Sequence, residues 1–66
     1  MSANPLSPRA AAFVSSSKLR AVLAFATARE LPELIEAHRW CRANGIPQKA
    51  ELILQAINRF APGGLR

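Results

Sequence analysis

Hydrophobic and polar residues follow one another along the C-terminal half of the chain with the spacing of two amphipathic helices. Over residues 32–43, apolar side chains recur every three or four positions and form a stripe made of Leu34, Ala37, Trp40 and Cys41. Over residues 47–60, a broader apolar face consists of Leu52, Ile53, Ala56, Ile57 and Phe60. Polar residues occupy the opposite faces, so each helix is expected to bury one side against a partner.

Residues at the ends of these two stretches support the same boundaries. Pro32 suits the first turn of a helix, where the missing backbone N–H costs nothing. Gly45 follows the first stretch and can adopt the left-handed conformation that often ends a helix. Pro62 and the two glycines after it stop the second stretch. The pattern predicts two helices joined by a short turn at Gly45.

Residues 18–31 fit two different secondary structures. In a helix, Ser17 would be the N-cap, and one face would carry Leu19, Val22, Leu23 and Ala26. In a strand, Lys18 and Arg20 would lie on one side, and the other side would carry Leu19, Leu23, Phe25 and Thr27. The alanine content favours the helix, and only the context of the later helices makes the strand competitive.

The length of 66 residues predicts one small domain. We expect a flexible N-terminal arm over residues 1–17, a domain over residues 18–61 and a short tail over residues 62–66. A chain this short buries little surface, and its single cysteine excludes an internal disulfide. One cysteine and one histidine, Cys41 and His38, cannot complete a zinc site, so we expect neither a metal nor a cofactor. Homodimer formation is the remaining expected source of stability.

The charge of the chain narrows the classes of function. Nine Lys and Arg residues against four acidic residues give a net charge of +5 and a pI near 11.3, which predicts attraction to polyanions such as nucleic acid. The chain has no apolar run of about 18 residues and no convincing secretory signal, so we expect a cytoplasmic protein that does not span a membrane. It has no Asp and no recognisable pair of nucleophile and base, so we do not expect an enzyme.

The residues after Gly45 distinguish two DNA-binding folds that have a glycine between two helices. In a helix-turn-helix, apolar anchors fall six and nine residues after the glycine, where this chain has Glu51 and Leu54. Burying Glu51 without a partner would be costly. The segment resembles instead the ribbon-helix-helix family of the Arc and MetJ repressors, over about residues 23–60. The matching positions are Leu34, Ala37, Trp40, Cys41, Gly45, Ala50, Glu51, Leu52, Ile53, Ala56 and Ile57.

This resemblance implies a homodimer whose N-terminal strands pair into a two-stranded ribbon that enters the major groove of double-stranded DNA. The expected fold is therefore mostly α, with a short strand before two helices, and the alternative is a three-helix all-α bundle. The implied dimer core consists of Phe25, Leu34, Trp40, Leu52, Ile53, Ala56, Ile57 and Phe60. The start of the second helix would direct backbone N–H groups at a phosphate, with Gln48 and Lys49 adding side-chain contacts.

The strand is where the sequence departs from the family. Polar residues usually alternate there, whereas the aligned positions are Ala24, Ala26 and Ala28, whose side chains cannot hydrogen-bond a base. An earlier strand would use Lys18 and Arg20, and a register shifted by one would use Thr27 and Arg29. The candidate DNA-binding residues are therefore Lys18, Arg20, Thr27, Arg29, Gln48 and Lys49.

These observations predict a small basic DNA-binding protein that acts as a homodimer, as a transcriptional repressor or an accessory factor of a phage, plasmid or chromosomal operon. The alternative is an all-helical adaptor, or a phage-type inhibitor of a host protein. Its protein-binding surface would include residues 21–25 and Leu54.

Overall fold

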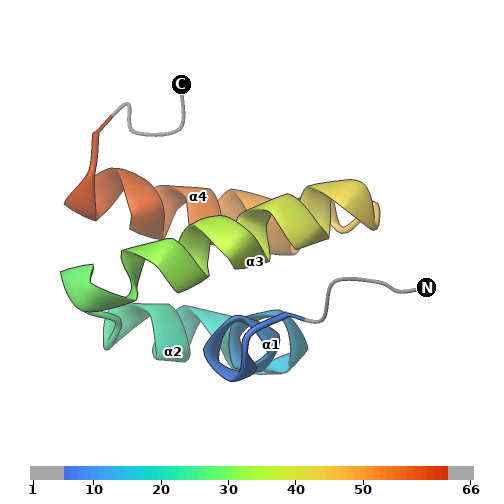
Figure 1. Cartoon of the computed structure of the whole chain (residues 1–66), viewed down its shortest axis with the longest axis horizontal. Coiled ribbons are helices and arrows are strands. Elements are labelled where there is room, and N and C mark those ends of the chain that lie inside the picture. Colours follow the sequence, from blue (N-terminus) through green and yellow to red (C-terminus); the bar gives the residue numbers. More distant parts are fainter. Residues whose placement is uncertain (1–5, 63–66) are drawn as a thin grey trace.

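The computed structural model describes residues 6–62, and this part of the chain consists of helices joined by short turns (Figure 1). In chain order the helical elements are α1 (Pro8–Ser15), α2 (Leu19–Ala24), the 3-10 helix η1 (Ala28–Glu30), α3 (Leu31–Ala43) and α4 (Pro47–Phe60). Helical residues make up 77% of the described part. The fold is therefore all-α, as in the helical alternative, but the described part contains four α-helices and a 3-10 helix where that alternative predicts three helices.

The N-terminal strand implied by the ribbon-helix-helix resemblance is not formed. No strand occurs between residues 6 and 62, and the segment that would supply the ribbon contains α2 and η1 instead. Its alanines favour a helix, and Leu19 and Leu23, one helical turn apart, are both buried against the rest of the chain. The prediction of a strand is wrong, and residues 18–30 are helical except for a short connection.

The expectation of a flexible arm over residues 1–17 is wrong for the part that the structure describes. Ser7 caps α1, because its Oγ accepts a hydrogen bond from the backbone N–H of Ala10 at 3.2 Å, and Pro8 occupies the first turn. Ala10 and Phe13 are completely buried, and α1 packs on α3. Residues 1–5 lie outside the described residues.

The two helices predicted in the C-terminal half are confirmed as α3 and α4, which lie side by side and antiparallel (Figure 1). The turn between them is a Schellman motif. Gly45 has a φ of +70°, the N–H of Ile46 donates to the carbonyl of Cys41 at 2.9 Å, and the N–H of Gly45 donates to the carbonyl of Arg42 at 3.4 Å. The predicted left-handed role of Gly45 is therefore confirmed.

The core is formed within one chain, where α1 packs on α3 and α2 packs on α4. Several residues predicted to form a dimer core fill this core instead, since their side chains are at most 3% exposed: Leu34, Ile53, Ala56 and Ile57. Trp40, Leu52 and Phe60 are partly buried against it, whereas Phe25 is 84% exposed. Their burial does not require a second copy, so self-association stays a prediction.

The C-terminal boundary agrees with the sequence pattern. α4 ends at Phe60, and the N–H of Ala61 still donates to the carbonyl of Ile57 at 2.8 Å. Of the predicted tail over residues 62–66, only Pro62 lies within the described residues. None of the helices in the described part has the length and apolar character needed to cross a membrane.

Candidate nucleic-acid interface

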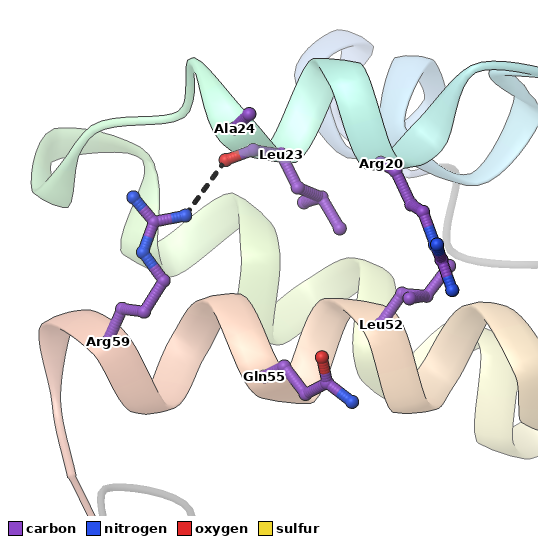
Figure 2. A pocket seen from close by; sticks show the side chains of 6 residues that line it. All are labelled: Arg20, Leu23, Ala24, Leu52, Gln55 and Arg59. Atoms are coloured by element: carbon purple, nitrogen blue, oxygen red, sulfur yellow. Dashed lines mark hydrogen bonds between the residues drawn. The ribbon is translucent and has the colours of Figure 1, made fainter.

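A basic groove runs between α2 and α4. Three adjoining hollows of about 280, 330 and 550 Å³ share Arg20 and Leu52 in their walls. Together they define the α2–α4 groove, which we describe by its polar and central residues Lys18, Arg20, Gln48, Lys49, Leu52, Gln55 and Arg59. Figure 2 shows Arg20 extending from α2 toward Leu52, while Arg59 reaches back from α4 to α2.

Helical periodicity brings these side chains together. On α4, residues 48, 52, 55 and 59 are separated by three or four positions and therefore lie along the side of the helix next to α2, with the exposed Gln48 and Gln55 at its solvent border. On α2, Leu19 and Leu23 are buried, so the adjacent Arg20 and Ala24 line the groove. The amphipathic pattern that buries one face of each helix thus directs its polar neighbours into the space between the helices.

Two of the cations hold the N-terminal helices onto α4. The Nζ of Lys49 donates a hydrogen bond to the carbonyl of Val14 near the end of α1. The Nη1 of Arg59 donates to the carbonyl of Leu23 near the end of α2, at 3.3 Å. Carbonyls in the last turn of a helix lack helical partners, and positive charge is favourable there. Lys49 and Arg59 therefore stabilise the fold while they add positive charge to the groove.

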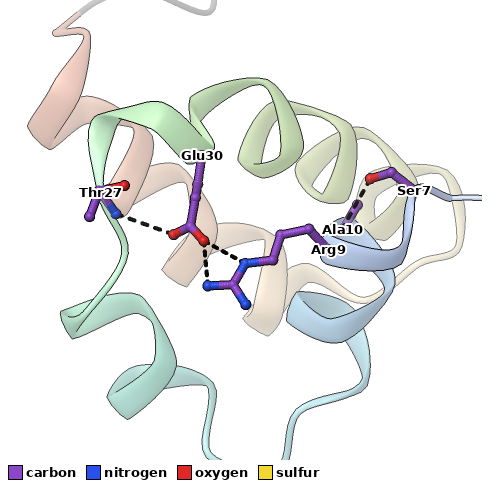
Figure 3. A network of polar contacts seen from close by, with 5 residues as sticks. All are labelled: Ser7, Arg9, Ala10, Thr27 and Glu30. Carbon is purple, nitrogen blue, oxygen red and sulfur yellow. Dashed lines mark hydrogen bonds and ion pairs between the residues drawn. The ribbon is translucent and has the colours of Figure 1, made fainter.

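Much of the acidic charge of the chain lies at a different contact. Figure 3 shows Glu30 in an ion pair with Arg9 of α1. Glu30 also accepts a hydrogen bond from the N–H of Thr27 at 3.2 Å, and Glu36 accepts one from the N–H of Ser7 at 3.1 Å. These carboxylates fasten α1 to η1 and α3, and neither lines the groove.

The groove cations are consequently not neutralised by ion pairs. Within residues 6–62, Lys18 and Arg20 form no ion pair, and both are exposed. The only carboxylate among the described residues that line the groove is that of Glu51, at its outer edge. A concave surface lined by cations concentrates positive potential and attracts anions.

The structure brings together part of the set of DNA-binding residues predicted from the sequence. Lys18, Arg20, Gln48 and Lys49 all line one hollow of the groove. The other two predicted residues, Thr27 and Arg29, lie at η1 and do not line it. Sequence reasoning missed Leu52, Gln55 and Arg59 as groove residues, although their spacing from Gln48 would have placed them on the same side of α4.

Two further candidate side chains, Cys41 and His38, have shifted pKa values. Cys41 is buried, and burial raises the pKa of its thiol, an effect that the positive charge of Lys49 partly opposes. Burial, followed by repulsion from Arg42, lowers the pKa of His38, whereas Glu51 raises it. No group of three or more His, Cys, Asp or Glu side chains that could hold a metal ion is found between residues 6 and 62.

The chain is therefore a small all-α protein with a basic groove beside α4. Comparison of the chain with protein-family models, with curated proteins and with solved structures found no match. The function is therefore inferred from the charge and geometry of the groove itself.

Proposed function

We propose that the protein binds double-stranded DNA through the α2–α4 groove, mainly by contacts to phosphates, and acts as a repressor or an accessory DNA-binding factor. The observation that carries this proposal is the convergence of Lys18, Arg20, Lys49 and Arg59 on one groove of a chain with a net charge of +5. A cation cluster of this kind provides the sequence-independent part of DNA affinity, because phosphate neutralisation releases condensed counterions.

Helices, and not a ribbon, would make the contacts. The side chains of Lys18 and Arg20, which are exposed at the start of α2, donate no hydrogen bond within residues 6–62. Lys49 and Arg59 each donate to a backbone carbonyl, yet a lysine has three donors and an arginine has five, so both retain donors for a phosphate. Contacts to between two and four phosphates predict that log K falls with log salt with a slope of about −2 to −4.

The experiment measures binding of a labelled random-sequence duplex by fluorescence anisotropy over a salt series. The double variant K18A/R20A removes the two free groove cations, and the double variant R29A/R39A removes two exposed cations that do not line the groove. Both variants lose the same charge, so the comparison separates a local site from the effect of net charge. The second variant also tests Arg29, which the sequence pattern offers as a DNA contact.

We expect K18A/R20A to lower the magnitude of the salt slope by about 1.8, because each neutralised phosphate contributes about 0.9 to that slope. The R29A/R39A protein should keep the slope and most of the affinity of the original. Equal reductions in the two variants would show that net charge alone attracts DNA. The absence of any binding of duplex DNA at low salt would end the proposal.

The alternative, a protein-binding module, has one observation in its favour. Phe25, which follows α2, is 84% exposed, and it is the one large hydrophobic side chain exposed among residues 6–62. Leu54, the other residue of that predicted surface, lines a separate hollow together with His38 and Pro47. Single hydrophobic residues are common on protein surfaces, so Phe25 supports this alternative less than the groove supports DNA binding.

A further inference from the structure

The outermost ridge of α4 carries a row of side chains that make no polar contact within the fold. Gln48, Glu51, Gln55 and Asn58 follow one another at intervals of three or four residues, and all four are exposed. None of these side chains forms a hydrogen bond or an ion pair within residues 6–62. We call this row the α4 ridge.

The residue types on the α4 ridge differ from those of an ordinary solvated helix. Exposed helices are commonly stabilised by pairs of Glu with Lys or Arg three or four positions away. Glu51 has no such partner, because the positions three and four away hold Pro47, Gln48, Leu54 and Gln55. The ridge therefore consists of amides and one carboxylate, all of which have unused hydrogen-bonding capacity.

Cations flank the ridge on both sides. Toward α2, the hollow beside Glu51 is also lined by Arg20. Toward α3, the hollow beside Glu51 is also lined by Arg42. A helix that lies in the major groove of DNA has one phosphate strand on each side and base edges in front of it. The order of cations, polar ridge and cations matches that arrangement of charge.

The dimensions of α4 also fit the major groove. A helix with side chains is about 10–12 Å across, and the major groove is about 12 Å wide. From residue 48 to residue 58 the ridge extends about 15 Å, which corresponds to roughly four base pairs. Gln and Asn amides pair with adenine in the major groove, and a carboxylate accepts a hydrogen bond from the amino group of cytosine.

On the basis of the function proposed above, we infer that α4 is a recognition helix that reads about four base pairs in the major groove of duplex DNA. Glu51 at its centre selects a cytosine, and Gln48 and Gln55 select adenines on either side. Arg20 contacts one phosphate strand, and Arg42 contacts the other. Glu51 also contributes to specificity by repulsion. Guanine and thymine present hydrogen-bond acceptors in the major groove, and these repel a carboxylate.

Selection from a duplex library with a randomised core tests this inference. We expect the protein to enrich a motif of about four base pairs that contains one invariant C·G pair. Exchange of that pair should weaken binding roughly 5- to 150-fold, the range of a good contact between a side chain and a base. E51A should lose the preference at that pair only, and should bind random duplex as well as the original protein or better.

E33A is the matched control, because it removes the same charge from α3 outside the ridge. It should retain the motif of the original protein. Circular dichroism of E51A should match that of the original, since Glu51 is exposed. Salt-dependent binding of random duplex without any enriched motif, or the same motif for E51A, would overturn the recognition helix and leave the proposed function intact. A failure to bind any duplex at low salt would reject both.

Discussion

Replacement of Phe13 by Ala is the sharpest test of how this fold is built, because the sequence pattern and the structure give this residue opposite roles. In a flexible arm, Phe13 would make no lasting contact. In the structure Phe13 belongs to α1 and its side chain is completely buried in the core. The guanidinium of Arg9 lies over its ring, 5.3 Å from the centroid. Phe13 is also the largest of the fully buried side chains.

The size of the effect follows from this burial. Truncation of a buried Phe to Ala typically lowers the free energy of unfolding by about 3–5 kcal/mol. A domain of this length has a total stability of about 3–10 kcal/mol, at roughly 0.05–0.15 kcal/mol per residue. A decrease of about 4 kcal/mol changes the folding equilibrium roughly a thousandfold and removes about two fifths or more of that stability.

Urea unfolding at 25 °C, followed by circular dichroism and by the fluorescence of Trp40, measures the decrease. F25A is the matched control, because the same residue type is replaced at a position that is 84% exposed, and its stability should change by about 0.5 kcal/mol or less. F13L keeps the protein folded and should cost less than about 1.5 kcal/mol. Equal urea midpoints for F13A, F25A and the original protein would show that α1 is not part of the core.

Three further changes test other parts of the fold. G45A should lower the free energy of unfolding by about 1–2 kcal/mol in urea titrations, because Gly45 has a φ of +70°; an unchanged value would mean that the turn is not left-handed. K49M should cost about 1.5–3 kcal/mol by the same measurement, because it removes the charged donor to the carbonyl of Val14, and an unchanged stability would discount that bond. Burial and Arg42 lower the pKa of His38 below its unfolded value of 6.5, so folding favours the neutral ring and stability should fall slightly as the pH drops through 6.5. H38Q should remove that part of the pH dependence, and an identical pH profile would contradict it.

The helices that the sequence predicts correctly are those whose evidence is local. The range 47–60 agrees with α4, and the range 32–43 differs from α3 by one residue at its start. In both cases an apolar stripe, a proline at the start and a stop signal at the end lie within one short stretch of sequence. The turn at Gly45 is equally local, and its conformation follows from the residue type.

The secondary structure of the N-terminal half is predicted wrongly from the sequence, because its helices depend on contacts with residues far away in the chain. α1 has only eight residues, and it packs on α3, which is distant in the sequence. A helix of that length is unstable alone, so only tertiary packing reveals it. The prediction of a strand depends on the spacing of apolar residues after Gly45. Any amphipathic helix that buries the same face has that spacing, so it does not distinguish the ribbon-helix-helix from other helical folds. The alanine content of residues 18–30 is the better guide.

Part of the groove could be predicted from the sequence even though the strand that suggested it is not formed. Lys18, Arg20, Gln48 and Lys49 are candidates because of their charge, their polarity or their place at the start of a helix, and these properties do not depend on a ribbon. Thr27 and Arg29 are candidates only in the register of a strand, and they do not line the groove. The strand register that made them candidates is not formed, and their contact with DNA stays a prediction.

The attachment of α1 and the charge of the groove have a common origin. The chain has four Glu side chains, and two of them contact the segment around α1. Glu30 forms an ion pair with Arg9, and Glu36 accepts a hydrogen bond from the N–H of Ser7. Because they are used at that contact, they do not neutralise the cations between α2 and α4. Lys49 and Arg59 each donate a hydrogen bond to a backbone carbonyl there, which does not cancel their charge. The same contacts that secure the short N-terminal helices therefore leave a net positive groove next to the polar ridge of α4.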